Sequence, residues 1–135
     1  MIKTFFLTIL LISTTAGLLI SQNSSLAQSI QRGKEVYTGN CMNCHMSQGE
    51  GLPAVYPPLA KSDYLLKDPK RAIGIILNGQ KGETTVNGQK YNVEMPAQNY
   101  LTDQQIADVI NYTTNTWGNK SKVVITPAQV KAGRK

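Results

Sequence analysis

The sequence has few of the residues that usually fill a protein core or bind metals. Its 135 residues include one histidine, one tryptophan, two cysteines and two phenylalanines. Both phenylalanines, Phe5 and Phe6, lie near the N-terminus, so the rest of the chain has none. The length suits a single domain, which excludes a multidomain enzyme and a polytopic membrane protein. A small domain so poor in large apolar side chains commonly needs a disulfide, a metal or another added group to complete its core.

Acidic residues are also scarce. The chain has 14 Lys or Arg against 8 Asp or Glu, for a net charge of +6. A basic surface keeps a protein soluble and can steer it toward acidic partners. Because the chain also has an export signal, we expect protein partners and no binding to nucleic acid.

Residues 1–27 have the pattern of a signal peptide. Lys3 precedes an apolar run over residues 5–20, and small residues stand at Ala27 and two positions before it. This arrangement predicts cleavage after Ala27 and a periplasmic protein. The alternative is an uncleaved membrane anchor, for which the run is short.

Capping residues and helical periodicity predict a mainly helical domain after this segment. A first helix is expected over residues 29–37, with Ser29 as its cap and Gly39 ending the segment. A short helical turn is expected at 63–66, with Ser62 as its cap. A clearer helix begins at Asp68-Pro69, a capping residue followed by a proline, and stops at Asn78-Gly79.

The strongest helix signal covers residues 103–117. Thr102 and Gln105 are spaced as a capping box, and an apolar stripe at helical spacing ends at Trp117.

Two weaker elements are also predicted. The Asn87-Gly88 pair predicts a small hairpin near residues 84–91. Residues 119–135 form a basic C-terminal extension, in which Thr126-Pro127 indicates a last helical turn.

Cys41-Met42-Asn43-Cys44-His45 is the spacing of covalent haem attachment. Two thiols three positions apart on a helical turn lie on one side, where both can add to the vinyl groups of one haem. His45, directly after the second thiol, then lies under the iron as a proximal ligand.

The cysteine pair has two other possible roles. A disulfide or a thioredoxin-like dithiol is conceivable in an exported protein, but no strand pattern precedes Cys41. A closed zinc site lacks ligands, because the chain has no third cysteine and no second histidine.

The second axial ligand is open to an argument by elimination. His45 is the only histidine, which excludes a second histidine ligand from the same chain. Met42 lies inside the attachment turn and Met46 adjoins the proximal ligand, so neither reaches the opposite face. Met95, followed by the stiff Pro96, is the remaining methionine; its alternative role is to fill a gap in the core.

At these residues the chain resembles a class I c-type cytochrome. The resemblance covers residues 29–118 and rests on Gly33 with Tyr37, Cys41-Met42-Asn43-Cys44-His45, Pro57-Pro58-Leu59, Met95-Pro96, and Val109 with Tyr112. Four further motifs resemble those of small cytochromes that are found alone or fused to copper nitrite reductases and other respiratory enzymes. They are Tyr56-Pro57-Pro58-Leu59-Ala60, Val86-Asn87-Gly88, Met95-Pro96-Ala97 and Trp117-Gly118-Asn119.

This resemblance implies an all-α cytochrome c fold, with helices around one haem c held by Cys41 and Cys44. The cytochrome c domain would span residues 28–118. The resemblance also implies metal ligation by His45 and Met95, since His/Met is a known ligand pair of this family.

Further roles are implied for residues around the cofactor. The carbonyl of Pro57, or of the adjacent Pro58, would accept a hydrogen bond from His45, and Leu59 would pack on the haem. Gly33 and the residues near it would cross the last helix of the domain.

An iron held on both sides has no open position, so we expect one-electron transfer and neither catalysis nor a small-molecule substrate. The predicted protein is a periplasmic carrier whose partners are a reductase, oxidase or dehydrogenase. Basic residues are candidates for docking such partners: Lys61, Lys67, Lys70, Arg71, Lys81 and Lys90.

Two alternative functions remain at this point. One is a haem c subunit, or an anchored module, of a larger dehydrogenase, reductase or oxidase complex, with residues 119–135 contacting the catalytic subunit. The other is a haem sensor or peroxidase in which Met95 is displaced.

Overall fold

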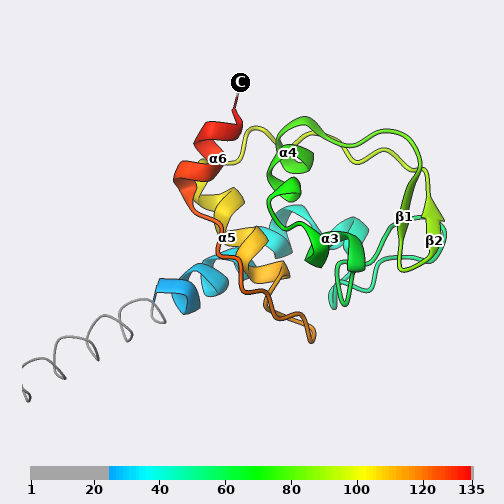
Figure 1. The fold of residues 1–135 in the computed structure, drawn as a ribbon, viewed down its shortest axis with the longest axis horizontal. Coiled ribbons are helices and arrows are strands. Elements are labelled where there is room, and N and C mark those ends of the chain that lie inside the picture. The colour runs from blue at the N-terminus through cyan, green and yellow to red at the C-terminus, as the bar shows by residue number, and fades with distance from the viewer. Residues whose placement is uncertain (1–24, 135) are drawn as a thin grey trace, which may run out of the picture.

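The computed structural model describes residues 25–134 (Figure 1). The predicted signal peptide therefore lies outside the described residues, except for its last three positions. Within the described residues, no helix has both the length and the apolar character needed to cross a membrane.

The first helix is longer than the sequence predicted. Residues 25–40 are helical, so Ser29 is not a cap and Gly39 does not end the segment. The Ser29 hydroxyl is buried and donates to the Asp108 carboxylate at 2.6 Å, which takes it away from its own backbone. A Cβ atom at Gly39 would meet nothing within 4 Å, so the helix passes through this position without a steric reason to stop.

Two short helices follow the attachment region. α2 (Met42–His45) comes directly after the first helix. α3 (Asp63–Lys67) has Ser62 as its cap, as predicted, because the Ser62 hydroxyl accepts from the Leu65 N–H at 3.2 Å.

α4 (Arg71–Asn78) begins slightly later than predicted. The Asp68 carboxylate does accept a hydrogen bond from the Arg71 N–H, at 3.3 Å. Pro69 and Lys70 lie in a tight turn before the helix, because Arg71 also bonds to the Asp68 carbonyl three residues back. The helix ends at Gly79, whose φ is +75°.

The predicted hairpin is confirmed. β1 (Thr84–Val86) and β2 (Gln89–Tyr91) are antiparallel, with Val86 opposite Gln89. Asn87 and Gly88 have φ values of +50° and +79°. Positive φ at both central residues is what the favoured two-residue hairpin turn requires.

α5 (Asp103–Thr113) has the predicted capping box but ends four residues before Trp117. The hydroxyls of Thr113 and Thr114 both donate to the Ile110 carbonyl, which weakens the continuation of the helix. Trp117 follows with a φ of +52°. Its ring still packs against the aromatic rings of the first helix and α5, at centroid distances of 4.9 and 5.2 Å.

The first helix and α5 cross at Gly33. A Cβ atom there would lie 2.0 Å from the Asp108 carbonyl oxygen, so the two backbones touch. One helical turn further on, the rings of Tyr37 and Tyr112 meet at a centroid distance of 5.5 Å. The crossing expected from the resemblance is thus present, and it anchors the main cluster of buried side chains.

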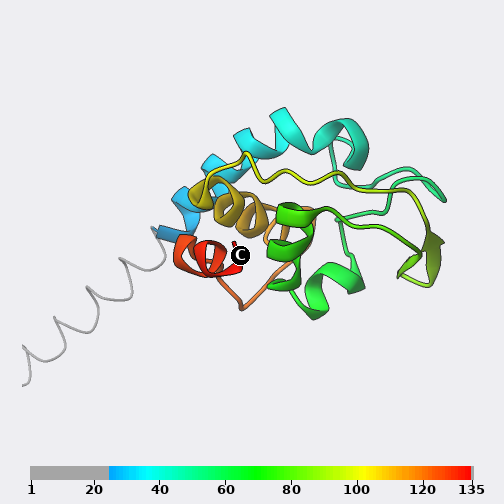
Figure 2. The ribbon, with the colours of Figure 1, turned by 90° about the horizontal axis from the view of Figure 1, so that it is seen from above.

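The C-terminal residues pack against the rest of the domain. The turn predicted at Thr126-Pro127 starts α6 (Pro127–Gly133), which has its own capping box. α6 lies beside α4 and α5 (Figure 2), and Val130 is fully buried. Asn111 of α5 also bonds to both the N–H and the carbonyl of Ile125.

Arg134 joins the end of α6 to the segment that leads into α5. Its guanidinium donates to the Asp103 carboxylate at 2.6 Å and to the Asn99 carbonyl at 2.8 Å. It also donates to the Leu101 carbonyl.

We expect Arg134→Ala to lower the free energy of unfolding by about 1 to 2 kcal/mol, because three partly exposed hydrogen bonds are lost. Guanidinium unfolding of the haem-containing protein measures this. The matched control is Lys131→Ala, since Lys131 is exposed on the same helix and its side chain makes no hydrogen bond to any residue within 25–134. Equal stability of the two variants would contradict this role.

Candidate functional site

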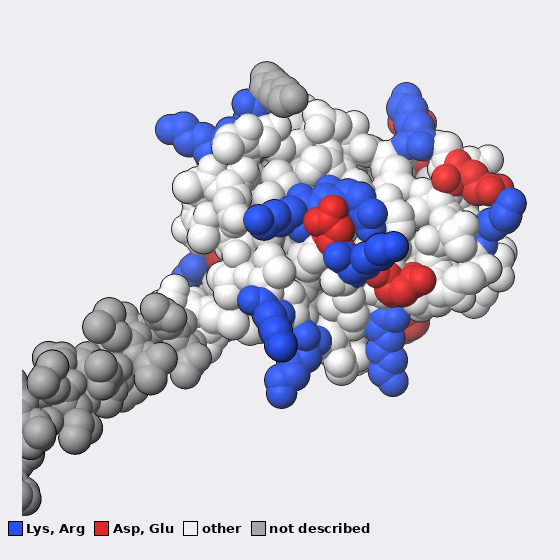
Figure 3. Space-filling view, viewed as in Figure 1, with Lys and Arg blue, Asp and Glu red and all other residues white. Residues whose placement is uncertain are grey.

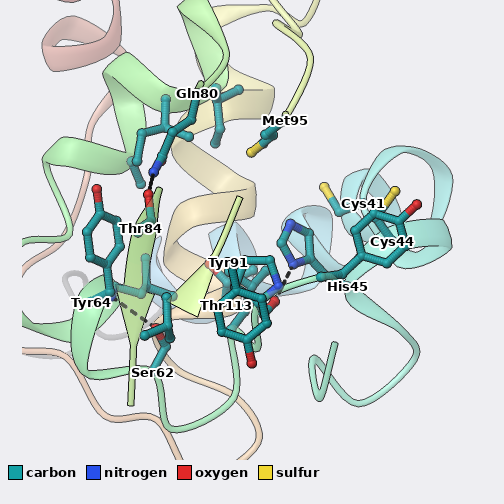
Figure 4. Close-up of a pocket in the computed structure, with 18 of the residues that line it drawn as sticks. Cys41, Cys44, His45, Ser62, Tyr64, Gln80, Thr84, Tyr91, Met95 and Thr113 are labelled. Atoms are coloured by element: carbon teal, nitrogen blue, oxygen red, sulfur yellow. Dashed lines mark hydrogen bonds between the residues drawn. The ribbon is translucent and has the colours of Figure 1, made fainter. Parts of the chain in front are cut away.

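One cleft brings together all the predicted site residues. It lies between α2, α4, α5, the hairpin and the segment that leads from β2 to α5. The predicted residues that line it are Cys41, Cys44, His45, Pro57, Leu59 and Met95. Figure 4 shows the histidine and the methionine entering it from different elements.

His45 is held by the loop that follows it. Its Nδ1–H donates to the Pro57 carbonyl at 2.9 Å, the bond expected from the resemblance, and the acceptor is Pro57 and not Pro58. Burial lowers the pKa of His45, although the bond to Pro57 acts in the opposite direction. The imidazole is therefore neutral near pH 7, with its other ring nitrogen free to act as a ligand.

The two cysteines lie one helical turn apart. Cys41 is the N-cap of α2 and Cys44 lies within it, so both sulfurs lie at the same end of the cleft (Figure 4). Burial, and next the neighbouring Cys44, raise the pKa of the Cys41 thiol to about 12. Cys44 is exposed, so the cleft reaches the surface on this side.

The turn after His45 is held by contacts with two aromatic side chains. Met46 has a φ of +64°, and its carbonyl accepts a hydrogen bond from the Tyr37 hydroxyl at 2.6 Å. Gly49 packs under the Trp117 ring, because a Cβ atom there would lie 2.5 Å from it. The aromatic cluster at the helix crossing therefore also supports the attachment turn.

Met95 is positioned by a short pairing with the end of α4. The backbone groups of Met95 and Gln80 exchange two hydrogen bonds, each of 2.9 Å. The residue before Gln80 must be glycine, because a Cβ atom at Gly79 would lie 2.6 Å from the Met95 carbonyl oxygen. In Figure 4 the Met95 sulfur points into the cleft, facing the imidazole of His45 across it.

Sequence reasoning missed a polar wall of the cleft. Arg71 lies over the ring of Tyr64, 3.6 Å from its centroid, and donates to the Tyr64 carbonyl. The Gln80 side-chain amide donates to the Thr84 hydroxyl (Figure 4). Tyr64, Arg71 and Thr84 come from α3, α4 and β1, and Gln80 lies between α4 and β1, so these residues form no local motif. The one available signal was a basic residue, Arg71, near a predicted helix start.

The donors in the cleft fit a haem better than a bare metal ion. A neutral imidazole and a thioether face each other, and two thiols one turn apart lie at the edge. Apolar side chains such as Leu59, Ile76 and Val109 line the walls between them. A His and a Met on opposite sides of the iron, with two thiols for covalent attachment, are the donor set of a c-type haem.

Helices around such a cleft define a class of small haem proteins, and comparison with known proteins agrees. A family model described as cytochrome c matches residues 30–117. Cytochrome c-552 of Thermus thermophilus is 35% identical over 114 residues, which cover 82% of this chain and 75% of that protein.

Two further relatives are parts of dehydrogenases. The gluconate 2-dehydrogenase cytochrome c subunit of Pantoea cypripedii is 36% identical over 108 residues, 78% of this chain and 24% of that subunit. The alcohol dehydrogenase (quinone) cytochrome c subunit of Gluconobacter oxydans is 31% identical over 99 residues, 73% of this chain and 21% of that subunit. The chain is thus similar to about a quarter or less of each.

The chain belongs to the cytochrome c family, as a class I monohaem c-type cytochrome. The predicted cytochrome c fold, dominated by helices and with one small hairpin, is confirmed. Its cofactor is haem c, attached through Cys41 and Cys44, and its function is electron transfer.

Proposed function

We propose that the protein is a periplasmic one-electron carrier whose single haem iron is bound by His45 and Met95. One observation supports this most strongly. The two side chains enter one cleft from different parts of the chain. The His45 ring is held by its hydrogen bond to the Pro57 carbonyl, and the backbone of Met95 is held by two hydrogen bonds to the backbone of Gln80.

When bound, the haem supplies an Fe(II)/Fe(III) couple, and the protein's residues set its properties. The bond to Pro57 holds the His45 ring in one orientation and strengthens it as a donor. The thioether of Met95 favours the reduced state and raises the reduction potential. If His45 and Met95 both held the iron, the chain would leave it no position for a substrate.

The polar wall suits the two carboxylates of a haem. Arg71 brings a guanidinium to the cleft, and Tyr64 brings a hydroxyl. A carboxylate on a guanidinium makes a strong, charge-assisted hydrogen bond. The opposite, exposed end at Cys44 then lies nearest to a partner protein.

The partners that fit this site are redox proteins such as a reductase, an oxidase or a dehydrogenase. Basic side chains lie across the centre of the face shown in Figure 3, with acidic ones among them. Of the predicted docking residues, Lys81 is paired with Glu94 at 3.1 Å and Lys90 with Glu83 at 2.9 Å. The net positive charge that remains favours encounter with acidic partners.

A subunit of a larger complex is the second candidate, and the similarity to the two dehydrogenase subunits favours it. Purification of the native protein separates the two candidates. A monomer whose N-terminus is Gln28 supports the free carrier and the predicted cleavage. Stable co-purification with a dehydrogenase, or retention of residues 1–27 in the membrane, supports the subunit or the anchored module.

Met95→Ala is expected to remove one of the two side chains that would hold the iron. The reduced variant should then bind carbon monoxide at neutral pH, which the wild-type protein should not do, and its reduction potential should fall because the thioether is lost. A carbon monoxide difference spectrum measures the first effect. Met42→Ala is the matched control, because Met42 lies in α2, on the attachment side of the cleft. Strong carbon monoxide binding by the wild type would instead support a sensor or a peroxidase.

A further inference from the structure

The hairpin closes one side of the haem cleft. Val86 of β1 and Tyr91 of β2 are buried, with exposed fractions of 3% and 7%, and both line the cleft. Thr84 lines it as well. In Figures 1 and 2 the hairpin lies at the end of the molecule opposite α6, away from the crossing helices. The buried cluster at that crossing therefore does not hold it in place.

The turn of the hairpin is tied to the start of α3 by a reciprocal pair of hydrogen bonds. The Asp63 N–H donates to Asn87 Oδ1 at 2.9 Å, and the Asn87 N–H donates to Asp63 Oδ1 at 2.7 Å. Within residues 25–134, these two bonds are the ones that join the turn to another element. We refer to them as the Asp63–Asn87 pair.

Other polar contacts of the hairpin hold it less firmly. The ion pair between Lys90 and Glu83 is within the hairpin region itself, and that between Lys81 and Glu94 lies at its base. All four side chains are more than half exposed, and exposed ion pairs contribute little to stability. Gln80 holds Thr84, the first residue of the three-residue strand β1, at the end of β1 away from the turn.

We propose that the Asp63–Asn87 pair keeps the hairpin closed over the haem and thereby raises the reduction potential. This rests on the proposed function, in which the cleft holds a redox-active iron. Oxidised haem carries one more positive charge than reduced haem, so contact with water stabilises the oxidised form. Burial of a redox centre and its access to solvent are recognised determinants of its potential. Asp63 and Asn87 are thus positioning residues that act through Val86 and Tyr91.

For a substitution of Asp63, the change in charge alone would shift the reduction potential in the direction opposite to that expected from opening the hairpin. The two effects can therefore be distinguished. Removing the Asp63 carboxylate takes away a negative charge and by itself raises the potential, because the oxidised form is less stabilised. Opening the hairpin lowers the potential. Asp63→Ala removes both the negative charge and the acceptor of the Asn87 N–H, and it leaves the bond from the backbone N–H of residue 63 to Asn87 in place. Asp63→Asn removes the charge but keeps an oxygen that can accept from the Asn87 N–H.

Asn87→Gly removes the other bond of the pair, from the Asp63 N–H to Asn87 Oδ1, without any change in charge. Asn87 has a φ of +50°, a conformation in which glycine is not strained, so the substitution removes the acceptor and leaves the turn possible. Gln89→Ala is the control within the hairpin, since its side chain is exposed and, among the described residues, bonds only to the neighbouring Lys90 carbonyl.

The test measures the reduction potential and the hydrogen exchange of the hairpin amides in the haem-containing protein. Asn87→Gly and Asp63→Ala are expected to have lower potentials than the wild type, and amide exchange should be about fivefold faster for each bond lost. Asp63→Asn and Gln89→Ala should not lower the potential. A potential equal to or above that of the wild type in both Asn87→Gly and Asp63→Ala would overturn the proposal.

The optical spectrum separates this proposal from the proposed function. All four variants are expected to keep the sulfur–iron band that methionine ligation produces. If the wild type lacked this band, the assignment of Met95 would fail. The potentials of Asn87→Gly and Asp63→Ala would still decide the role of the hairpin.

Discussion

The double variant Cys41→Ala with Cys44→Ala, prepared without haem, is expected to show no cooperative unfolding transition. Half-buried side chains such as Leu59 and Ile76 lie between the core and the haem cleft, and without haem they lose their partner on that side. Residues 7–135 include no phenylalanine that could take the place of the cofactor. The expected loss is at least about 5 kcal/mol, comparable to the whole stability of a small domain.

Far-UV circular dichroism during thermal or urea unfolding measures this effect. Cys44→Ala alone is the matched control, because Cys41 still provides one covalent bond to haem and the haem-containing protein should unfold cooperatively. A cooperative transition in the haem-free double variant would show that the side chains alone complete the core.

Gly33→Ala is expected to be the most damaging single substitution outside the cleft. The added Cβ atom would lie 2.0 Å from the Asp108 carbonyl oxygen and 2.7 Å from the Tyr112 Cβ atom. Backbone atoms cannot move away as a flexible side chain can, so the two helices must separate. We expect a loss of about 3 kcal/mol or more, at the upper end of overpacking effects.

Gly39→Ala is the control on the same helix. A Cβ atom at Gly39 meets nothing within 4 Å, and alanine in place of a helical glycine stabilises by about 0.5 to 1 kcal/mol. Guanidinium unfolding of both haem-containing variants gives the comparison. If Gly33→Ala were as stable as Gly39→Ala, the close helix crossing described here would be incorrect.

The parts of the site that the sequence could predict are those tied to local spacing. The attachment of one haem by two thiols needs a fixed separation, so Cys41 and Cys44 were recognisable, with His45 next to them. The capping box at Thr102 and the turn at Asn87-Gly88 are local as well. For each of them, the residues that determine the structure are within a few positions of one another.

The features that could not be predicted depend on contacts between distant segments. Serine is a residue type that commonly caps helices, but the Ser29 hydroxyl bonds to Asp108, 79 positions away. The apolar stripe through Trp117 suggested a longer helix, yet hydroxyls near residue 113 bond to the preceding turn and the helix ends there. The Asp63–Asn87 pair likewise joins residues 24 positions apart.

The visible spectrum of the oxidised protein tests most directly whether His45 and Met95 hold the iron. Methionine ligation produces a weak absorption band that arises from the sulfur–iron bond. We predict this band in the wild type and in Met42→Ala, and its absence in Met95→Ala. Retention of the band in Met95→Ala, or its absence from the wild type, would contradict the assignment of Met95.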